Sequence, residues 1–365
     1  MIAYWAAAIV ATLAGGGLLA RRARRRREEA RAWLRGVRSV ISDDSDAAIA
    51  ALSDAARLGS DEAIDTYLAL GALFRRTGDL ARAMSLHRNM RVYPKLDAAR
   101  RDEVERELAE DYRRSGMLAE AVDLLAPRAA TDRAAAELLR EVLSDQGRWR
   151  EAAEVQRRRG EGPPDPVLAH LLAAASRAES EGGGKEGVAL AREATAADAS
   201  SADALLALAE AEGSGGRPAG ALEAFGRALD ADPRAAVLAW PALARIPDRS
   251  AAFESLAARI ARAPADAALH FLQGRVLLAE GRNGEALAAF RNALELDDHG
   301  EVTVAMRDLL RSAEAPGPDD VVARHDLLVV ALMKKARGPR CARCGAESAQ
   351  RQWRCRRCGA WDPHR

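Results

Sequence analysis

The stretch LALGALFRRTGDLARAMSLHRNMR, residues 68–91, decides the fold of this chain. Its small and large apolar residues recur with the spacing of a helix, and Gly78 divides the run into two helices. Glycine adopts positive φ without strain, so Gly78 suits the end of the first helix. The small residues Gly71 and Ala83 would let the two helices approach closely, and Phe74 would fill the space beside the next pair. The stretch therefore predicts a helical hairpin that packs against similar hairpins.

The same pattern recurs along the middle of the chain, with repeats about 34 residues long. One small residue begins the second helix of each unit, at Ala48, Ala83, Ala121, Ala152, Ala189, Ala221, Ala252 and Ala286. This is the tetratricopeptide pattern, in which stacked hairpins form a curved superhelix with a groove. We assign residues 29–315 to about eight such repeats. The units around 179–187 and 240–247 depart from the pattern, which predicts a kink or a change of curvature there.

Composition supports an all-α fold. Ala, Leu, Arg and Glu dominate, and these residues lose little free energy on entering a helix. No alternating Val, Ile and Thr run precedes the last thirty residues. After a Pro-Gly-Pro break at 316–318, residues 319–336 are expected to form a helix that caps the final repeat.

The pattern of the amino-terminal segment predicts a membrane anchor. From Ile2 to Ala20 there is no charged residue, and six arginines follow between Arg21 and Arg27. A helix over this run would be about 30 Å long, the thickness of the hydrocarbon core of a bilayer. Clustered arginine resists translocation, so the chain after Arg21 is expected to stay in the cytoplasm. A cleavable signal peptide would carry its positive charge before the apolar run, whereas here the charge follows it. We predict one transmembrane helix at 1–20, a basic juxtamembrane segment at 21–28 and a cytoplasmic body; the alternative is a buried or peripheral helix.

Four arginines lie late on first helices, which line the concave groove in this type of repeat. They are Arg75, Arg76, Arg113 and Arg114. One interpretation is a basic patch that binds an acidic partner. The other is solvated arginine that complements the helix dipole. His87, His270 and His299 have no second metal-binding residue near them in sequence, so we expect them to be structural or exposed.

The cysteines predict a metal site at the carboxyl terminus. All four lie in two C-x2-C pairs ten residues apart, at Cys341, Cys344, Cys355 and Cys358. Four thiolates at this spacing surround one tetrahedral ion, either zinc or iron. The segment 338–365 is too short for a core of its own, so the metal would supply most of its folding free energy. We do not expect a disulfide-rich secreted domain, because no cysteine lies in the body of the chain.

The side chains around the cysteines leave two questions open. We expect Trp353 and Trp361 to pack over the metal module or to hold it against the neighbouring helices. Seven arginines make the module basic, which suits nucleic acid, anionic lipid or an acidic protein. No nucleophile–base pair or phosphate-binding loop occurs, and four thiolates leave no open metal position, so we do not expect an enzyme.

In the order of its parts the chain resembles the lipopolysaccharide assembly protein B family (LapB, also called YciM). The resemblance rests on the anchor ending in arginine, on Leu34-Arg35-Gly36 in the first repeat, on the run 68–75, on Asp111-Tyr112, and on the terminal cysteine pairs with their tryptophans. It implies a tetratricopeptide superhelix with a rubredoxin-like terminal module at 338–365 that packs against the repeats. It also implies one metal ion, Zn or Fe, on the four cysteines named above.

The resemblance further implies what the protein does. Members of this family sit in the bacterial inner membrane, with the amino terminus periplasmic and the repeats in the cytoplasm. They regulate lipopolysaccharide synthesis by promoting degradation of the deacetylase that commits flux to lipid A, together with the membrane AAA+ protease FtsH. The expected partners are therefore that protease, lipid A biosynthesis proteins and the inner membrane, and we do not expect nucleic acid. The alternative is a generic protein- or nucleic-acid-binding repeat scaffold, and the oligomeric state stays open.

Overall fold

The computed structural model describes most of the chain after residue 63. The described residues are four positions between 21 and 31, and 64–93, 96–160, 162–180, 185–246, 249–297, 300–311, 328–332, 338–348 and 350–364. The predicted anchor at 1–20, Ala48 of the first repeat and most of the predicted cap at 319–336 lie outside them. Among the residues that are described, no helix is long and apolar enough to cross a membrane.

The chain divides into two compact units, Met1–Gln146 and Gly147–Arg365. In the first unit, the helices are α3 (Ile64–Arg76), α4 (Leu80–Arg91), α5 (Ala98–Ser115), α6 (Leu118–Leu125) and α7 (Arg133–Asp145). Each helix packs against the next one, and α5 also contacts α3 and α7. Contacts between consecutive helices, together with contacts between helices two places apart, are typical of stacked hairpins.

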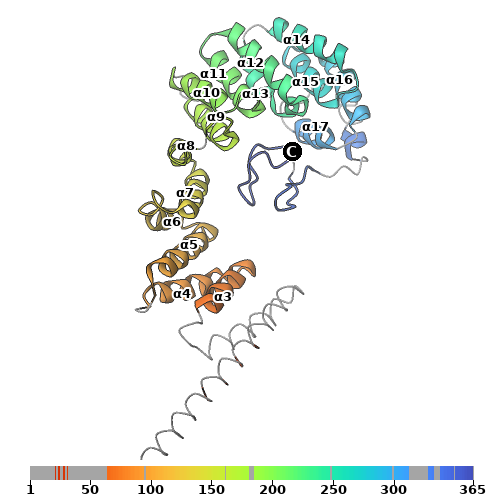
Figure 1. Ribbon diagram of the computed structural model, residues 1–365. Coiled ribbons are helices and arrows are strands. Elements are labelled where there is room, and N and C mark those ends of the chain that lie inside the picture. The colour runs from red at the N-terminus through yellow and green to blue at the C-terminus, as the bar shows by residue number, and fades with distance from the viewer. Residues whose placement is uncertain are drawn as a thin grey trace, which may run out of the picture. The chain divides into compact units, whose positions relative to one another are not determined.

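The second unit is also built of helices. Its helices are α8 (Trp149–Arg157), α9 (Pro166–Ser180), α10 (Lys185–Ala197), α11 (Ala202–Ser214), α12 (Pro218–Ala231), η1 (Pro233–Leu238), α13 (Trp240–Ala244), α14 (Arg249–Arg262), α15 (Ala267–Ala279), α16 (Asn283–Leu296) and α17 (Glu301–Arg311). The pairs α9–α10, α11–α12 and α15–α16 form the hairpins, and one apolar core runs from α11 to α17. Figure 1 shows these helices stacked in chain order, with the C-terminal segment beside them.

The hairpins are held by small residues at one fixed helical position. The fourth residue of α4, α6, α8, α12, α14 and α16 is an alanine with no exposed surface: Ala83, Ala121, Ala152, Ala221, Ala252 and Ala286. In α10 the prediction is wrong by one residue, because Val188 holds the fourth position and Ala189 is exposed. A shift of one residue turns a side chain by about 100° around a helix, so Ala189 cannot face the partner helix.

The predicted irregularity near 240–247 is a broken first helix. A 3₁₀ helix, η1, and the five-residue helix α13 stand where one continuous helix would begin the unit. Each has a proline in its first turn, at Pro233 and Pro241, and Asp232 caps η1 by accepting a hydrogen bond from the Arg234 amide at 3.1 Å. A proline inside a longer helix would remove one backbone hydrogen bond, so the chain restarts the helix instead.

For the described residues the prediction of an all-α repeat fold is confirmed, since none of them forms a strand. The carboxyl-terminal segment contains only two isolated antiparallel bridges, Arg340 with Glu347 and Arg354 with Trp361. This segment, residues 338–364, holds the four cysteines, and we refer to it as the knuckle.

Candidate metal centre

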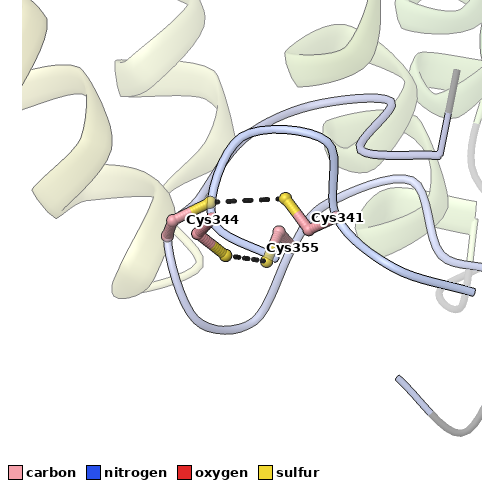
Figure 2. Close-up of side chains that lie close together, drawn as sticks. Cys341, Cys344 and Cys355 are labelled. Atoms are coloured by element: carbon pink, nitrogen blue, oxygen red, sulfur yellow. Dashed lines mark hydrogen bonds between the residues drawn. The ribbon is translucent and has the colours of Figure 1, made fainter. Parts of the chain in front are cut away.

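The four cysteine sulfurs converge on one point. The Sγ atoms of Cys341 and Cys358 lie 3.7 Å apart, those of Cys344 and Cys355 lie 3.8 Å apart, and all four fall within 4.8 Å of one another (Figure 2). A tetrahedral zinc site with bonds of about 2.3 Å has sulfur–sulfur distances of about 3.8 Å. The donor set therefore fits one tetrahedral metal ion, and the same all-sulfur set suits zinc or iron.

Two equivalent turns position the sulfurs. The sequences RCARCGA at 340–346 and RCRRCGA at 354–360 are near-copies, fourteen residues apart. In each turn the first cysteine amide donates to the alanine carbonyl five residues on, at 2.9 and 2.8 Å. In each, a glycine with φ near +70° donates back to the first cysteine carbonyl; these are Gly345 and Gly359. Positive φ explains why glycine ends both turns.

The two thiols of the second pair differ in acidity. Burial disfavours the Cys355 thiolate, but the amide N–H groups of Cys358 and Arg357 donate to it and lower its pKa to about 7. Burial, together with the neighbouring sulfurs, raises the pKa of Cys358 to about 12. Within the second pair, Cys355 therefore ionises more readily than Cys358. A bound divalent ion would keep all four sulfurs ionised.

Trp361 packs the knuckle against helices α8 and α9. Its ring stacks on His170 of α9, with centroids 5.1 Å apart and planes 4° apart, and meets Trp149 of α8 edge to face at 6.1 Å. The guanidinium of Arg354 lies over both indoles, 5.9 Å from Trp149 and 5.7 Å from Trp361. Such offset and cation–π contacts stabilise most when water is excluded.

A buried charge network fixes the orientation of His170. The Nδ1 atom of His170 lies 2.6 Å from Asp203 Oδ2, and Arg177 donates to Asp203 Oδ1 at 2.6 Å. Burial opposes ionisation of Asp203, but Arg177 and His170 more than offset it and hold the pKa of this carboxyl below its usual range. These contacts therefore fix the orientation of the imidazole on which the Trp361 indole stacks.

Arg351 forms the second attachment of the knuckle. Its side chain is only 1% exposed and donates to Asp232 Oδ2 at 2.6 Å. Asp232 is also the residue that caps η1. Trp353 packs against the core that runs from α11 to α17 and lies 6.2 Å from the His170 ring. The knuckle thus joins α8 and α9 to η1, which lies further along the stack.

The groove arginines separate into two environments. Arg75 donates to Asp111 at 2.8 Å and to Glu107 at 2.5 Å, and its side chain is 16% exposed. Arg113 donates to Asp145 at 2.6 Å and also pairs with Glu141. Arg76 is exposed; so is Arg114, which pairs with Glu110 of its own helix at 2.8 Å. Arg75 and Arg113 therefore bind successive repeats together, and an acidic partner would reach only Arg76 and Arg114 directly.

The histidines predicted to be structural have different surroundings. His87 is fully buried, and its Nδ1 lies 2.6 Å from Asp111 Oδ2. His270 is 9% exposed, and its Nε2 lies 3.0 Å from the Pro264 carbonyl. His299 lies outside the described residues.

We call the contact between the knuckle and the repeats the docking face. Four of its residues were not foreseen from the sequence: Trp149, His170, Asp232 and Arg351. The knuckle contacts them across 119 to 212 positions of chain, since Asp232 pairs with Arg351 and Trp149 meets Trp361. No local spacing can reveal such contacts. One available signal was the duplicated RCxRCGA motif, which shows that Arg354 and Trp361 hold the places of Arg340 and Glu347 in the first turn.

Known proteins resemble parts of this arrangement. Residues 267–299, which include α15 and α16, match the tetratricopeptide repeat family model. No curated protein matches the chain. Among solved structures, the TPR2AB domain of yeast Sti1 in its pHSP90 complex is 13% identical, with 83% of this chain and 98% of that chain covered and a TM-score of 0.29.

Two further structures are similar at the same level. A tetratricopeptide repeat protein from Parabacteroides merdae is 15% identical, with 84% and 99% of the two chains covered and a TM-score of 0.33. The Cut9–Hcn1 hetero-tetramer of the APC/C is 12% identical, with 86% and 73% covered and a TM-score of 0.34. The chain therefore carries a tetratricopeptide repeat at residues 267–299, within a longer series of helical hairpins.

Proposed function

We propose that this chain is a regulatory scaffold of the bacterial inner membrane that controls lipopolysaccharide synthesis. In this role it brings the deacetylase that commits flux to lipid A to the membrane AAA+ protease FtsH, and it carries out no catalysis itself. The amino-terminal segment at 1–20 tethers the body to the cytoplasmic face. Tethering raises the local concentration of the repeats beside other membrane proteins, so weak contacts suffice.

The observation that carries the proposal is the knuckle seated on the repeats. A recognition surface of stacked hairpins is generic, but a terminal four-cysteine module fixed to α8, α9 and η1 by Trp361 and Arg351 is specific. This combination is what the resemblance to the LapB family implies. The metal would be held by Cys341, Cys344, Cys355 and Cys358 as a closed structural site, because four protein ligands leave no position for substrate.

The test is a crosslinking pull-down from bacterial membranes. Intact protein should recover the membrane protease or a lipid A biosynthesis enzyme, whereas Cys341→Ser should recover much less because its knuckle lacks a ligand. A Gln350→Ala variant, changed at an exposed position of the knuckle and not at a metal ligand, should behave as the intact protein. Recovery of neither class of partner by the intact protein would refute the proposal. Full regulation of lipid A synthesis by a chain that lacks residues 2–20 would refute the tethering role.

A further inference from the structure

A pocket of about 200 Å³ opens where the second unit passes from one hairpin to the next. Its walls come from the C-terminal ends of α12 and α14 and from the residues that begin η1 and α15. The lining includes Leu229, Asp230, Arg259, Arg262, Asp266 and Leu269. No cysteine lines it, so the pocket is separate from the metal centre.

The size of the pocket limits what it can hold. An apolar cavity of about 150 Å³ takes up a benzene molecule, whereas sites for cofactors and drug-sized ligands occupy about 300–1,000 Å³. A volume of about 200 Å³ therefore suits a single side chain. Leu229 and Leu269, which are only 2% and 3% exposed, supply an apolar part of the lining.

One ion pair forms a fixed wall of the pocket. Arg259 donates to both carboxylate oxygens of Asp230, through Nη1 and, at 3.2 Å, through Nη2. Gly226 makes room for this guanidinium, because a Cβ atom there would lie 3.0 Å from Arg259 Nη2. The Arg259 side chain is only 13% exposed, so its charge is already neutralised and largely covered.

The remaining two charges of the pocket differ in how well they are engaged. Asp266 is the N-cap of α15, and its Oδ1 accepts from two backbone amides at 2.9 and 3.1 Å. Arg262 is exposed in the last turn of α14, where its Nε donates to the Ala258 carbonyl of the same helix at 3.4 Å. In the part of the chain that the structure describes, no carboxylate forms an ion pair with Arg262. Its charge still acts on the pocket, since the hydrogen bond from Arg259 and the charges of both arginines hold the pKa of Asp230 below its usual range, against the effect of burial.

The chemistry of the pocket selects a carboxylate beside an apolar group. A guanidinium pairs with a carboxylate through two parallel hydrogen bonds, and Arg262 offers that fork. A lysine or arginine side chain fits less well, because the ion pair and the helix cap already engage both aspartates. A phosphate monoester, with close to two negative charges, would be repelled more strongly by the same aspartates.

We infer that this pocket binds an apolar residue of a protein partner together with an adjacent carboxylate. The apolar side chain contacts Leu229 and Leu269, and the carboxylate pairs with Arg262. The carboxylate is either the terminal one of that residue or the side chain of a neighbouring Asp or Glu. The site is additional to the proposed scaffold function and does not rest on it.

The test measures the binding of small probes to the full-length protein in neutral detergent, by saturation-transfer NMR, with protein-free micelles as the blank. N-acetyl-leucine should bind, and N-acetylglycine, which lacks the apolar side chain, should bind more weakly. Arg262→Gln should bind N-acetyl-leucine about tenfold more weakly, the factor that corresponds to a hydrogen bond on a charged group. The matched control Arg291→Gln removes the same charge from an exposed position of α16 and should bind as the intact protein. Both substitutions are at exposed positions, so the helical circular dichroism signal should be unchanged.

A second pair of probes distinguishes the two sources of the carboxylate. Tighter binding of N-acetyl-leucine than of acetyl-Leu-Glu-amide assigns the site to a terminal carboxylate, and the reverse order assigns it to an acidic side chain. Either order supports the inference, provided that Arg262→Gln weakens the tighter probe.

Specific outcomes overturn the inference. Equal loss in Arg262→Gln and Arg291→Gln would mean that only net charge matters. Tighter binding of leucinamide, which carries a positive charge, would mean that the aspartates select a cation. Binding of inorganic phosphate through Arg262 without binding of N-acetyl-leucine would replace the carboxylate with another anion, and binding of none of these probes would refute the site. A negative result leaves the membrane pull-down unaffected, so the two proposals fail separately.

Discussion

The ring of His170 on α9 stacks on the indole of Trp361, with centroids 5.1 Å apart and planes 4° apart, although the two residues belong to opposite ends of the second unit. In a solenoid each repeat contacts only its neighbours. The knuckle breaks that rule, because Trp361 reaches α8 and α9 while Arg351 reaches the cap of η1. The knuckle therefore acts as a brace: it links α8 and α9 directly to η1, which are otherwise connected only through the helices between them.

His170→Asn should loosen this brace. The asparagine amide can still donate to Asp203, but the stacked ring is lost, and such ring pairs contribute about 0.5–1.5 kcal/mol beyond their buried area. Hydrogen exchange should become faster in the amides of residues 351–364. As a control, His270→Asn on α15 changes a histidine that contacts the Pro264 carbonyl, and it should leave exchange in the knuckle unchanged. Identical exchange in the two variants would show that the stack does not hold the knuckle.

Arg351→Met should destabilise the attachment to η1. The change leaves the Asp232 carboxylate without its 2.6 Å partner, and a hydrogen bond to a charged group contributes about 1.5–3 kcal/mol. Urea unfolding of the second unit should show a loss in that range. Arg356→Met, on the same knuckle but exposed, should change the free energy of unfolding by less than about 0.5 kcal/mol. A loss for Arg356→Met as large as that for Arg351→Met would contradict the assignment.

Removal of the metal should release the brace. A chelator would unfold the knuckle, since a segment this short gains most of its stability from the ion. Trp353 and Trp361 should then become exposed, shifting tryptophan emission to the red, and amides in α8 and α9 should exchange faster. The helices of the first unit, such as α4 and α5, serve as an internal control and should keep their exchange rates. Unchanged tryptophan emission after the metal is removed would argue against metal-dependent docking.

The sequence predicts the repeats well because the pattern is local. Fully buried alanines occupy one helical position in six hairpins, and each lies within a few residues of the turn that sets its register. The prediction fails at Ala189 because the distance from the start of the helix decides which side chain is buried, and in α10 Val188 holds that position. The convergence of the four cysteines likewise follows from two local turns.

The environments of charged residues were not predictable from the same pattern. Arg75 and Arg113 look like groove residues, but each also pairs with carboxylates that lie 28 to 36 positions away on the next hairpin. A single sequence gives their position on the helix and not the ion pairs between helices. The docking face shows the same limit, since His170 and Asp232 are polar residues with no local motif around them.

Acid should weaken the docking face through Asp203. Its pKa is lowered in the folded protein, because Arg177 and His170 more than offset the effect of burial. Stability from the ionised carboxylate is therefore fully present above its unfolded pKa of about 3.9 and is lost as the pH falls towards the lower folded value. Asp203→Asn should lose stability at pH 7 and show a flatter decline of unfolding free energy below about pH 4.

The matched control for this pH experiment is Glu223→Gln. Glu223 is exposed on α12, so the variant should keep both the stability of the intact protein and its acid dependence. Urea titrations at pH 7, 4 and 3 provide the measurement. An acid profile for Asp203→Asn that parallels the profile of the intact protein would place the acid sensitivity in other groups.

Gly274→Ala tests whether close helix approach holds the tetratricopeptide hairpin at 267–299. A Cβ atom at Gly274 would lie 2.2 Å from Phe290 Cε1, and the Phe290 ring cannot move easily because it is fully buried and lies 6.1 Å from the Phe271 ring. Overpacking of this kind costs about 1–3 kcal/mol. The same substitution at Gly284, in α16 of the same hairpin, meets nothing within 4 Å and should instead stabilise the helix by up to about 1 kcal/mol. Thermal unfolding should therefore shift in opposite directions for one chemical change, and a shift of the same sign at both positions would mean that helix propensity, not packing against Phe290, governs this hairpin.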